Sequence, residues 1–505
     1  GTVLIDSRGD LNITGEIHAD GGVDGDGGTV LTWADGLNNF TADAVITADG
    51  GSISGDGGFI ELSGNNVRVR GDISLSAPNG AAGTLLIDPP AITIANGTGT
   101  ASSATVYEQW IESQSVLGFN VILAADDTIT MSDLTTDGVL QGGSGNISLS
   151  VSGDGPGDGI FFNDLNDKIA TTTGSITLNA ISGSGAISGA VNVGHLETTG
   201  NFGDITVTAG AGGIQVAGIA TGGAVSDPGD VNLWTVNSGD ITTGPISIIA
   251  TDSSNASAYL WTNAAGDLTI NGDVLVSVAA NQNATSGSVQ AYAYAYANLN
   301  AANNIIVNGN VTVDAIAINN ASSASGAGAY AYLDATAGGT GDITITGATL
   351  VSADAEQTGA SSGWGTAYAS AYADLNAANN IIVNGNVTVD AAAINNAYYA
   401  SGAGAYAYLD ATAGGTGDIT ITGATLVSAD AEQTGASSGG GNAYAYAYAA
   451  ILDGGSAMSL GPITVDAIAI NNAYYGLGAS AYANLYVNDT NGSLTINGSV
   501  NVSAD

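Results

Sequence analysis

The sequence predicts an all-β parallel solenoid, in which each coil packs only against its neighbours. The first observation is a repeat: LNAANNIIVNGNVTVDA begins at Leu299 and returns unchanged at Leu375, 76 positions later. The second is the alternation of small apolar and polar residues, because a period of two is typical of strands. The third is the Gly, Asn and Asp between these runs, which favour turns. Repetition at a fixed period is typical of solenoids.

Each 76-residue repeat contains two similar halves, so one coil of this array is expected to span about 38 residues. The apolar positions of the two halves align in sets of three: Val311, Val313 and Ala315 with Thr349, Val351 and Ala353. The positions between them are mostly polar, such as Thr312, Asp314, Ser352 and Asp354. One face of each strand is therefore predicted to line the core, while the other faces solvent.

The composition excludes several classes of partner. The chain has 505 residues, no Cys, and 4 Lys+Arg against 46 Asp+Glu, for a formal charge of -42. Binding to nucleic acid or to an anionic membrane surface needs clustered Lys and Arg, so neither partner is expected. No apolar run approaches the roughly 20 residues that span a bilayer, so we expect no membrane insertion. The lack of Cys rules out disulfides and is compatible with a secreted protein.

Residues 1–94 form the first predicted segment, a β-helix of short strands such as TVLID and LNITGEI separated by Gly-rich turns. Its run GGFIELSGNNVRVRGDISLSAPNGAAGTLLIDPPAITI, from Gly57 to Ile94, resembles a segment of the large secreted exoproteins of the filamentous haemagglutinin family. The similarity extends to Asn120–Thr130, which resembles the family's "NV.L.A..DIT" run. This resemblance implies a right-handed parallel β-helix.

The same resemblance implies a location and a role. Members of the family cross the outer membrane through a dedicated transporter in two-partner secretion, and act as adhesins or surface fibres. A secreted, extracellular protein of a bacterial cell surface, active in cell adhesion and biofilms, is therefore expected, with an outer-membrane transporter among its partners. The family's amino-terminal secretion domain is absent from this sequence, and the Tyr-rich repeats are not part of the family pattern.

Residues 95–120 interrupt the strand alternation, and SSATVYEQWIESQSVLG predicts one short lateral helix near residues 104–117. Thr105 and Glu108 have the spacing of a capping box. An apolar stripe is expected from three residues: Val106, Trp110 and Leu117. The helix is predicted to pack over a side of the β-helix, with a docking site for a partner as the alternative.

Residues 121–255 predict irregular β-helix coils, and residues 256–505 predict the Tyr/Ala-rich array. Coils of about 20 residues are expected before the array. In the array, 19 of the 20 Tyr residues lie at or after Tyr259. Aliphatic residues end the alternating runs in phase with Ala: Leu299, Leu333, Leu375, Leu409, Ile451 and Leu485. Tyr is therefore predicted to point outward, since burying its hydroxyl unpaired costs roughly 1 to 3 kcal/mol.

Outward Tyr side chains at equivalent positions of stacked coils should form ladders at about the strand spacing of 4.8 Å. The possible interaction ladder comprises Tyr292, Tyr294, Tyr296, Tyr330, Tyr332, Tyr368, Tyr372, Tyr406, Tyr408, Tyr444, Tyr446, Tyr448 and Tyr482. Such an aromatic stripe would bind sugar rings, neighbouring rods or a second copy. The alternative is that Tyr only has high strand propensity and covers the backbone. Tyr398, Tyr399, Tyr474 and Tyr475 are expected in projecting loops.

The residues needed for catalysis are sparse. His18 and His195 lie far apart in sequence, so no catalytic triad or His metal cluster is predicted. Arg68 and Arg70 alternate on a strand beside Asp72, which favours an outward polar face. The turns GGVDGDGG at Gly21 and SGDGGF at Ser54 place carboxylates where they could bind Ca²⁺, but a turn-forming role is the simpler interpretation. No enzyme activity and no cofactor are expected, with Ca²⁺ a weak alternative.

The sequence therefore predicts a structural and adhesive fibre that turns over no substrate. Gly1 begins within a strand pattern and Asp505 ends midway through a repeat, so end-to-end stacking of copies into filaments would pair the exposed strand edges. Lateral contacts between copies and contacts with surface glycans are the other expected associations. The alternative function is a carbohydrate-binding or carbohydrate-degrading β-helix, which would need aromatic residues beside clustered acids and a base.

Overall fold

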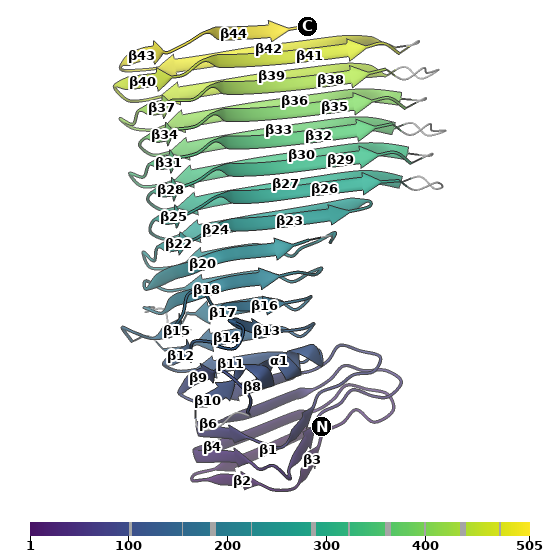
Figure 1. Cartoon of the computed structure of the whole chain (residues 1–505), viewed down its shortest axis with the longest axis vertical. Coiled ribbons are helices and arrows are strands. Elements are labelled where there is room, and N and C mark those ends of the chain that lie inside the picture. The colour runs from purple at the N-terminus through teal and green to yellow at the C-terminus, as the bar shows by residue number, and fades with distance from the viewer. Residues whose placement is uncertain are drawn as a thin grey trace. The chain divides into compact units, whose positions relative to one another are not determined.

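The all-β prediction is confirmed by the computed structural model, in which strands dominate and a single short helix is described (Figure 1). The structure describes residues 1–99, 104–153, 155–181, 188–223, 225–283, 289–321, 324–358, 365–397, 400–434, 441–473 and 476–505. The chain divides into two compact units, one of residues 1–221 with 232–243, the other of residues 222–231 with 244–505. The described helix offers no segment long and apolar enough to cross a bilayer.

The first unit is a stack of parallel strands. Its elements, of which β20 and β21 each reach one residue past its boundary, are β1 (Thr2–Ser7), β2 (Leu11–Ile13), β3 (Glu16–His18), β4 (Thr29–Phe40), β5 (Val45–Thr47), β6 (Phe59–Val69), β7 (Asp72–Ser74), β8 (Thr84–Asp88), β9 (Ala91–Ala95), β10 (Thr105–Tyr107), α1 (Glu108–Val116), β11 (Asn120–Ala125), β12 (Thr128–Met131), β13 (Val139–Gln141), β14 (Ile147–Val151), β15 (Gly159–Phe162), β16 (Lys168–Thr171), β17 (Ile176–Ala180), β18 (Ala190–Thr198), β19 (Ile205–Ala209), β20 (Gly213–Gly222), β21 (Val231–Thr235) and β22 (Ile241–Thr243).

The coils of the first unit are longer than expected. Thr2 pairs with Thr29 and Thr29 with Phe59, so one coil runs from position 2 to position 28 and the next from position 29 to position 58. Further along the chain, Ile147 pairs with Ile176, which marks a coil of similar length. The expected length of about 20 residues is therefore wrong. The reason is that one coil carries several strands with their turns; β1, β2 and β3 all precede the return of the chain at β4.

The predicted helix exists, but its details differ from the sequence prediction. Helix α1 begins at Glu108, because Thr105 and Val106 belong to strand β10. The N-cap residue is Tyr107, and no side chain caps the helix. The Thr105–Glu108 capping box is therefore wrong: the Glu108 carboxylate instead accepts a hydrogen bond from the backbone N–H of Gly97 at 2.8 Å.

The predicted apolar stripe of the helix is also wrong. Val106 is buried, but it lies in the strand, and Leu117 is 62% exposed. The buried residues of α1 are Glu108, Ile111, Gln114 and Ser115. The Ser115 hydroxyl donates to the carbonyl of Gly145 at 2.7 Å. The helix contacts β10, β11 and β13, so it does lie against the coils, as predicted.

The second unit is the regular array. Its elements are β23 (Ile246–Asp252), β24 (Asn255–Ala264), β25 (Leu268–Ile270), β26 (Val274–Gln282), β27 (Val289–Ala301), β28 (Ile305–Val307), β29 (Val311–Asn319), β30 (Ala324–Ala337), β31 (Ile343–Ile345), β32 (Thr349–Gln357), β33 (Gly365–Ala377), β34 (Ile381–Val383), β35 (Val387–Asn395), β36 (Ala400–Ala413), β37 (Ile419–Ile421), β38 (Thr425–Gln433), β39 (Asn442–Asp453), β40 (Ala457–Leu460), β41 (Ile463–Asn471), β42 (Gly478–Asp489), β43 (Ser493–Ile496) and β44 (Val500–Ala504).

Each coil of the array has three strands, one long, one of three or four residues, and one of intermediate length, as the teal-to-yellow ribbons show (Figure 1). Val311 pairs with Thr349 and Val313 with Val351, so the two halves of the sequence repeat are successive coils. The predicted parallel β-helix and its register are thus confirmed here. The right hand implied by the resemblance agrees with the strong preference of parallel crossover connections for that hand.

The core of the array is built from small residues. On the long strands Ala295, Ala331 and Ala371 pair in register, and each is 0% exposed. Further along the same strands, large and small residues alternate between coils: Ala297, Leu333, Ala373, Leu409 and Ala449 in one row, and Leu299, Ala335, Leu375, Ala411 and Ile451 in the next. Odd and even coils therefore interlock, because Leu333, Leu375 and Leu409 each lie between two Ala residues.

A buried asparagine at the end of β35 bonds the backbone at one corner of the coil. The side-chain N–H₂ of Asn395 donates to the carbonyl oxygens of Gly365 and Gly402, at 2.9 and 2.8 Å. Its side-chain oxygen accepts from the backbone N–H of Ala397 at 3.2 Å. Asn395 is 0% exposed, so it satisfies three backbone groups away from water.

Replacing Asn395 by alanine is expected to destabilise the array by about 1–3 kcal/mol, because buried backbone groups lose their partners. The matched control is Asn396→Ala, since Asn396 is exposed. The midpoint of urea unfolding, followed by far-ultraviolet circular dichroism, checks this. Equal midpoints for the two variants would contradict the role given to Asn395.

Candidate interaction surfaces

The outward side of the long strands of the array, called here the tyrosine face, is formed by β24, β27, β30, β33, β36, β39 and β42. Along β24, β27, β30, β33, β36 and β39 the Ala residues that alternate with Tyr are buried, whereas Tyr is half-buried or exposed on all seven strands. In β27, for example, Ala293 and Ala295 are 0% exposed whereas Tyr292 is 40% exposed. The predicted outward orientation of Tyr is therefore confirmed for all thirteen residues of the predicted ladder. Tyr398, Tyr399, Tyr474 and Tyr475 lie outside the described residues.

One row of rings runs in a zigzag across the face. It comprises Tyr292, Tyr330, Tyr368, Tyr406, Tyr444 and Tyr482. Successive ring centroids lie 6.5, 5.5, 5.1, 5.4 and 5.6 Å apart. The planes are inclined by 27–39° to one another. All these separations lie in the range in which aromatic pairs attract each other.

The zigzag exists because glycine or serine is the register partner of most of these rings on a neighbouring coil. Tyr368 pairs with Gly328 on one side and with Gly404 on the other. A Cβ atom added at Gly328 would lie 2.6 Å from the Tyr292 ring, so this ring covers the glycine backbone. Each ring then contacts the Tyr that lies two residues from its register partner, alternately after it and before it along the neighbouring strand.

A second row lies beside the zigzag. It comprises Tyr296, Tyr332, Tyr372, Tyr408 and Tyr448, which pair in register. The rings of Tyr332, Tyr372 and Tyr408 are 6.4 and 6.2 Å apart. Tyr294 and Tyr446 bridge the rows, with Tyr294 5.5 Å from Tyr332 and Tyr446 5.3 Å from Tyr408.

The sequence prediction missed part of this surface. The Trp261 ring lies 4.8 Å from Tyr296, and Tyr259 lies 5.4 Å from Tyr294. The register of β24 with β27 brings them there, and β24 lies outside the exact sequence repeat. Tyr486, 53% exposed on β42, is a further aromatic of this face. The available signal was the alternation of Tyr259 and Trp261 with the apolar residues Ala258 and Leu260.

A column of aspartates flanks the second row: Asp334, Asp374 and Asp410 pair in register on β30, β33 and β36. Burial, and then the neighbouring charges of Asp410 and Asp334, raise the pKa of Asp374 to about 6. Burial and then the phenols around it likewise raise the pKa of Tyr368, to about 12. The face therefore combines neutral phenols with closely spaced carboxyl groups.

A second acidic surface, called here the aspartate face, is the outward side of β29, β32, β35, β38 and β41. One register row alternates Asp and Ser: Asp314, Ser352, Asp390, Ser428 and Asp466. The Ser352 hydroxyl donates a hydrogen bond to the Asp314 carboxylate. Next to this row, burial and the charge of Asp390 raise the pKa of both Asp354 and Asp430 to about 6. These groups can exchange protons near neutral pH.

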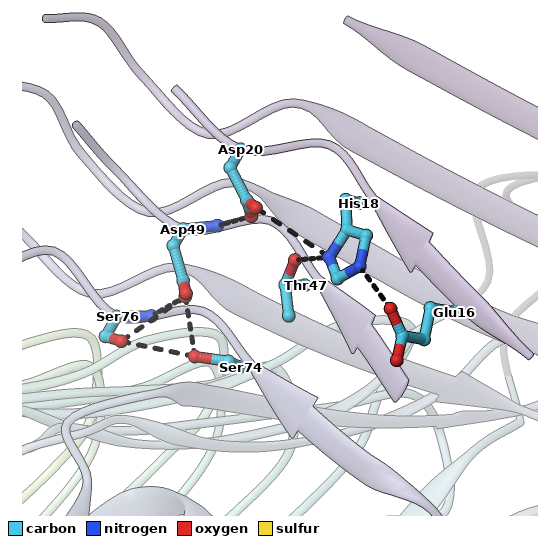
Figure 2. Close-up of polar contacts among 7 residues, drawn as sticks. All are labelled: Glu16, His18, Asp20, Thr47, Asp49, Ser74 and Ser76. Atoms are coloured by element: carbon cyan, nitrogen blue, oxygen red, sulfur yellow. Dashed lines mark hydrogen bonds and ion pairs between the residues drawn. The ribbon is translucent and has the colours of Figure 1, made fainter. Parts of the chain in front are cut away.

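His18 lies in a polar cluster on the small sheet β3–β5–β7 (Figure 2). Its Nδ1 is 2.8 Å from the Thr47 hydroxyl and its Nε2 is 3.0 Å from the Glu16 carboxylate. A hydroxyl, an imidazole and a carboxylate thus stand in the order of a hydrolase triad, which the sequence did not predict. The His18 side chain is 51% exposed, and nearby Asp49 likewise accepts from Ser74 at 2.6 Å on the next coil. The cluster therefore acts as a polar ladder between coils.

A depression of about 360 Å³ on the first unit brings a base, acids and an aromatic ring together. Its lining includes Arg8, Asp6, Glu61 and Trp33. The Trp33 indole N–H donates to the Asp35 carboxylate at 3.0 Å, which fixes the ring while leaving it 43% exposed. The sequence singled out Arg68 and Arg70 instead. Arg68 on β6 is half-buried, and Arg70, directly after β6, is exposed, consistent with the predicted outward face.

The turn carboxylates proposed for Ca²⁺ mainly bind backbone groups. The carboxylate of Asp26 accepts from the N–H of Asp56 at 2.9 Å, and that of Asp56 accepts from the N–H of Ala81 at 2.8 Å. A separate group, Asp133, Asp164 and Asp167, has carboxylate oxygens within 4.8 Å of one another. Three protein oxygens are fewer than the six to eight ligands that Ca²⁺ takes, so waters would have to complete the shell.

Comparison with known proteins gives no relative: no protein-family model matches the chain, and no curated protein matches it. The resemblance of residues 57–94 to filamentous haemagglutinin-like exoproteins therefore stays a prediction from the motif. What the fold and the faces define is a parallel β-solenoid with repeated aromatic and acidic surfaces.

Proposed function

We propose that this chain is a non-enzymatic, extracellular structural and adhesive protein of a bacterial cell surface. The observation that carries the proposal is the tyrosine face, which repeats the same rings on coil after coil. The motif between Gly57 and Ile94, which resembles the haemagglutinin-like exoproteins, supports secretion through an outer-membrane partner. The low content of Lys and Arg argues against nucleic acid as the partner.

The partner we propose for the tyrosine face is a surface glycan or a second copy of the chain. Half-exposed rings offer apolar faces with hydroxyl tips, and the carboxylates beside them accept hydrogen bonds from sugar hydroxyls. Several weak contacts along one rigid face add up, because the coil spacing fixes the rings relative to one another.

A second candidate function, carbohydrate binding or degradation, is favoured by the depression around Arg8 and Trp33. Glycoside cleavage uses two carboxyl groups on either side of the bond, and Asp6 and Glu61 both line the depression. This candidate places the sugar on the first unit, whereas adhesion through the tyrosine face places it on the second.

The test is retention of the full chain on immobilised cellulose, alginate and the chain itself. Replacing Tyr330, Tyr332, Tyr368 and Tyr372 by serine is expected to weaken retention by about tenfold or more, since each aromatic contact contributes roughly 0.5–1.5 kcal/mol. The control replaces Thr312 and Thr388, which face outward on the aspartate face, by serine. Retention that survives the Tyr substitutions but is lost in Trp33→Ala would favour the second candidate. New reducing or unsaturated ends appearing with turnover would contradict a non-enzymatic protein.

A further inference from the structure

The zigzag row brings together phenol rings that lie a full coil apart in the chain. Tyr330, Tyr368, Tyr406 and Tyr444 come from four successive coils, with centroids 5.5, 5.1 and 5.4 Å apart. Their planes are inclined by 32–33°, so the rings are closer to parallel than to an edge-to-face arrangement. The ring edges of successive coils are therefore in van der Waals range.

The backbone holds these rings in place. Strands β30, β33, β36 and β39 pair along their length in parallel register, at the spacing of about 4.8 Å that sheet hydrogen bonds impose. The Cα atoms that carry these rings cannot separate while the coils stay paired. They can still turn about the Cβ–Cγ bond, because this torsion is soft in tyrosine. Two ring edges can thus approach each other without backbone movement.

We propose that the tyrosine face is a site of oxidative modification, where tyrosines on adjacent coils couple to form dityrosine within one chain. The inference goes beyond the adhesive role and does not depend on it. It requires only the ring geometry and a one-electron oxidant, such as a haem peroxidase supplied with hydrogen peroxide.

The chemistry balances as follows. Each of two neighbouring phenols loses one electron and one proton and becomes a phenoxyl radical, with unpaired spin on the carbons next to the C–O bond. Two such carbons form a C–C bond, and the hydrogen on each moves to its own oxygen, which restores both phenols. One bond thus releases two electrons and two protons, and one hydrogen peroxide takes up both pairs and becomes two waters.

The surroundings of the rings suit this coupling. Burial and the neighbouring phenols raise the pKa of Tyr368 to about 12, so the ring is a neutral phenol at physiological pH and must lose its proton together with the electron. The partly exposed rings can pass that proton to water, and the second row can pass it to the carboxyl column of Asp334, Asp374 and Asp410. A radical also meets a partner at once, since each ring has a neighbour on both sides.

The resulting bond would join one coil to the next. Because a solenoid loses structure by separation of neighbouring coils, a covalent link between them opposes that separation directly. Bonds between several pairs of coils would cross-link the array covalently along its tyrosine face, without any cysteine.

The experiment treats the dilute full-length chain with a haem peroxidase and hydrogen peroxide. Monomer is isolated by size exclusion, dityrosine is measured by its fluorescence, and linked peptides are mapped by mass spectrometry. We expect the peptide from β33 to be linked to the AYAYLD peptide of β30 and β36, its neighbours on either side. Peptides of β27 and β39, two coils away from β33, should not be linked to it.

Matched variants separate the ladder from random coupling. Tyr368→Phe with Tyr372→Phe keeps the rings but removes both phenols of β33, so links to the β33 peptide should be lost while circular dichroism is unchanged. Tyr107→Phe, in β10 of the first unit, should leave the dityrosine yield unchanged. Equal yield from the urea-unfolded chain, links spanning two coils as often as one, or dityrosine found only in oligomers would each overturn the proposal.

Discussion

Replacing Ala391 by leucine is expected to lower the stability of the array by about 1–3 kcal/mol or more, because extra carbons overfill a packed core. Ala391 is 0% exposed on β35, and its register neighbours are Ala353 and Ala429. Strand β35 packs against β33 and β36 of the tyrosine face, whose inward residues are mostly alanine. The interior at this position therefore has room for a methyl group and no more.

The matched control is the next residue. Ala392→Leu places the same side chain outward, where the register neighbours are Asp354 and Asp430, so stability should change by less than about 0.5 kcal/mol. Near-ultraviolet circular dichroism of tyrosine follows the array selectively, because 19 of 20 Tyr residues lie at or after Tyr259. If both variants melt at the same temperature, the inference that alanine fills a tightly packed interior at this position is wrong.

Lowering the pH from 7.5 to 5 is expected to stabilise the array. Burial and neighbouring charges raise the pKa of Asp354, Asp374 and Asp430 to about 6 in the folded chain, from 3.8 for an ordinary aspartate. A raised pKa means that the folded state binds the proton more tightly than the unfolded state. Stability from these groups is thus fully present below pH 3.8 and is lost as the pH rises through 6.

The size of this pH effect is moderate because the groups are partly exposed. A shift of about two pKa units corresponds to about 3 kcal/mol per group without screening. Solvent access reduces this to roughly 1 kcal/mol each. The thermal midpoint of the array should therefore rise on acidification, and the rise is read by the tyrosine signal at each pH.

The pH effect has a direct control in the amide variants. Asp354→Asn with Asp430→Asn mimics the protonated pair, so this variant should be more stable at pH 7.5 and should gain less on acidification. The double variant Asp43→Asn with Asp72→Asn removes the same charge from exposed positions of the first unit. If the thermal midpoint of the Asp354 and Asp430 variant depends on pH as strongly as that of the unchanged chain, these two carboxyl groups do not cause the pH effect.

The array was predictable from sequence because its repeats reveal the register. The alignment of Val311 with Thr349 in the sequence is the strand pairing in the structure. Once the register is known, alternation decides which side chains point inward, and the outward Tyr residues follow. The aspartate rows follow by the same reasoning, although the pKa of Asp354 depends on a diagonal neighbour that no linear pattern displays.

The first unit was less predictable because its coils do not repeat in sequence. The contact of His18 with Thr47 and the grouping of Arg8 with Trp33 depend on pairing offsets that vary from coil to coil. The predicted start of helix α1 was wrong for a different reason. Thr105 extends a parallel pairing with Thr93 on β9, and this tertiary contact outweighs a local cap.

The interlocking of odd and even coils sets the smallest genetic step by which this protein can change its length. Leu333 fits between Ala297 and Ala373, Tyr368 between Gly328 and Gly404, and Asp390 between Ser352 and Ser428. Excising a single coil would set like against like at every one of these rows, whereas excising two adjacent coils restores each match. A duplication or deletion should therefore be tolerated only when it adds or removes two coils together. This accounts for a sequence repeat that is twice as long as one coil.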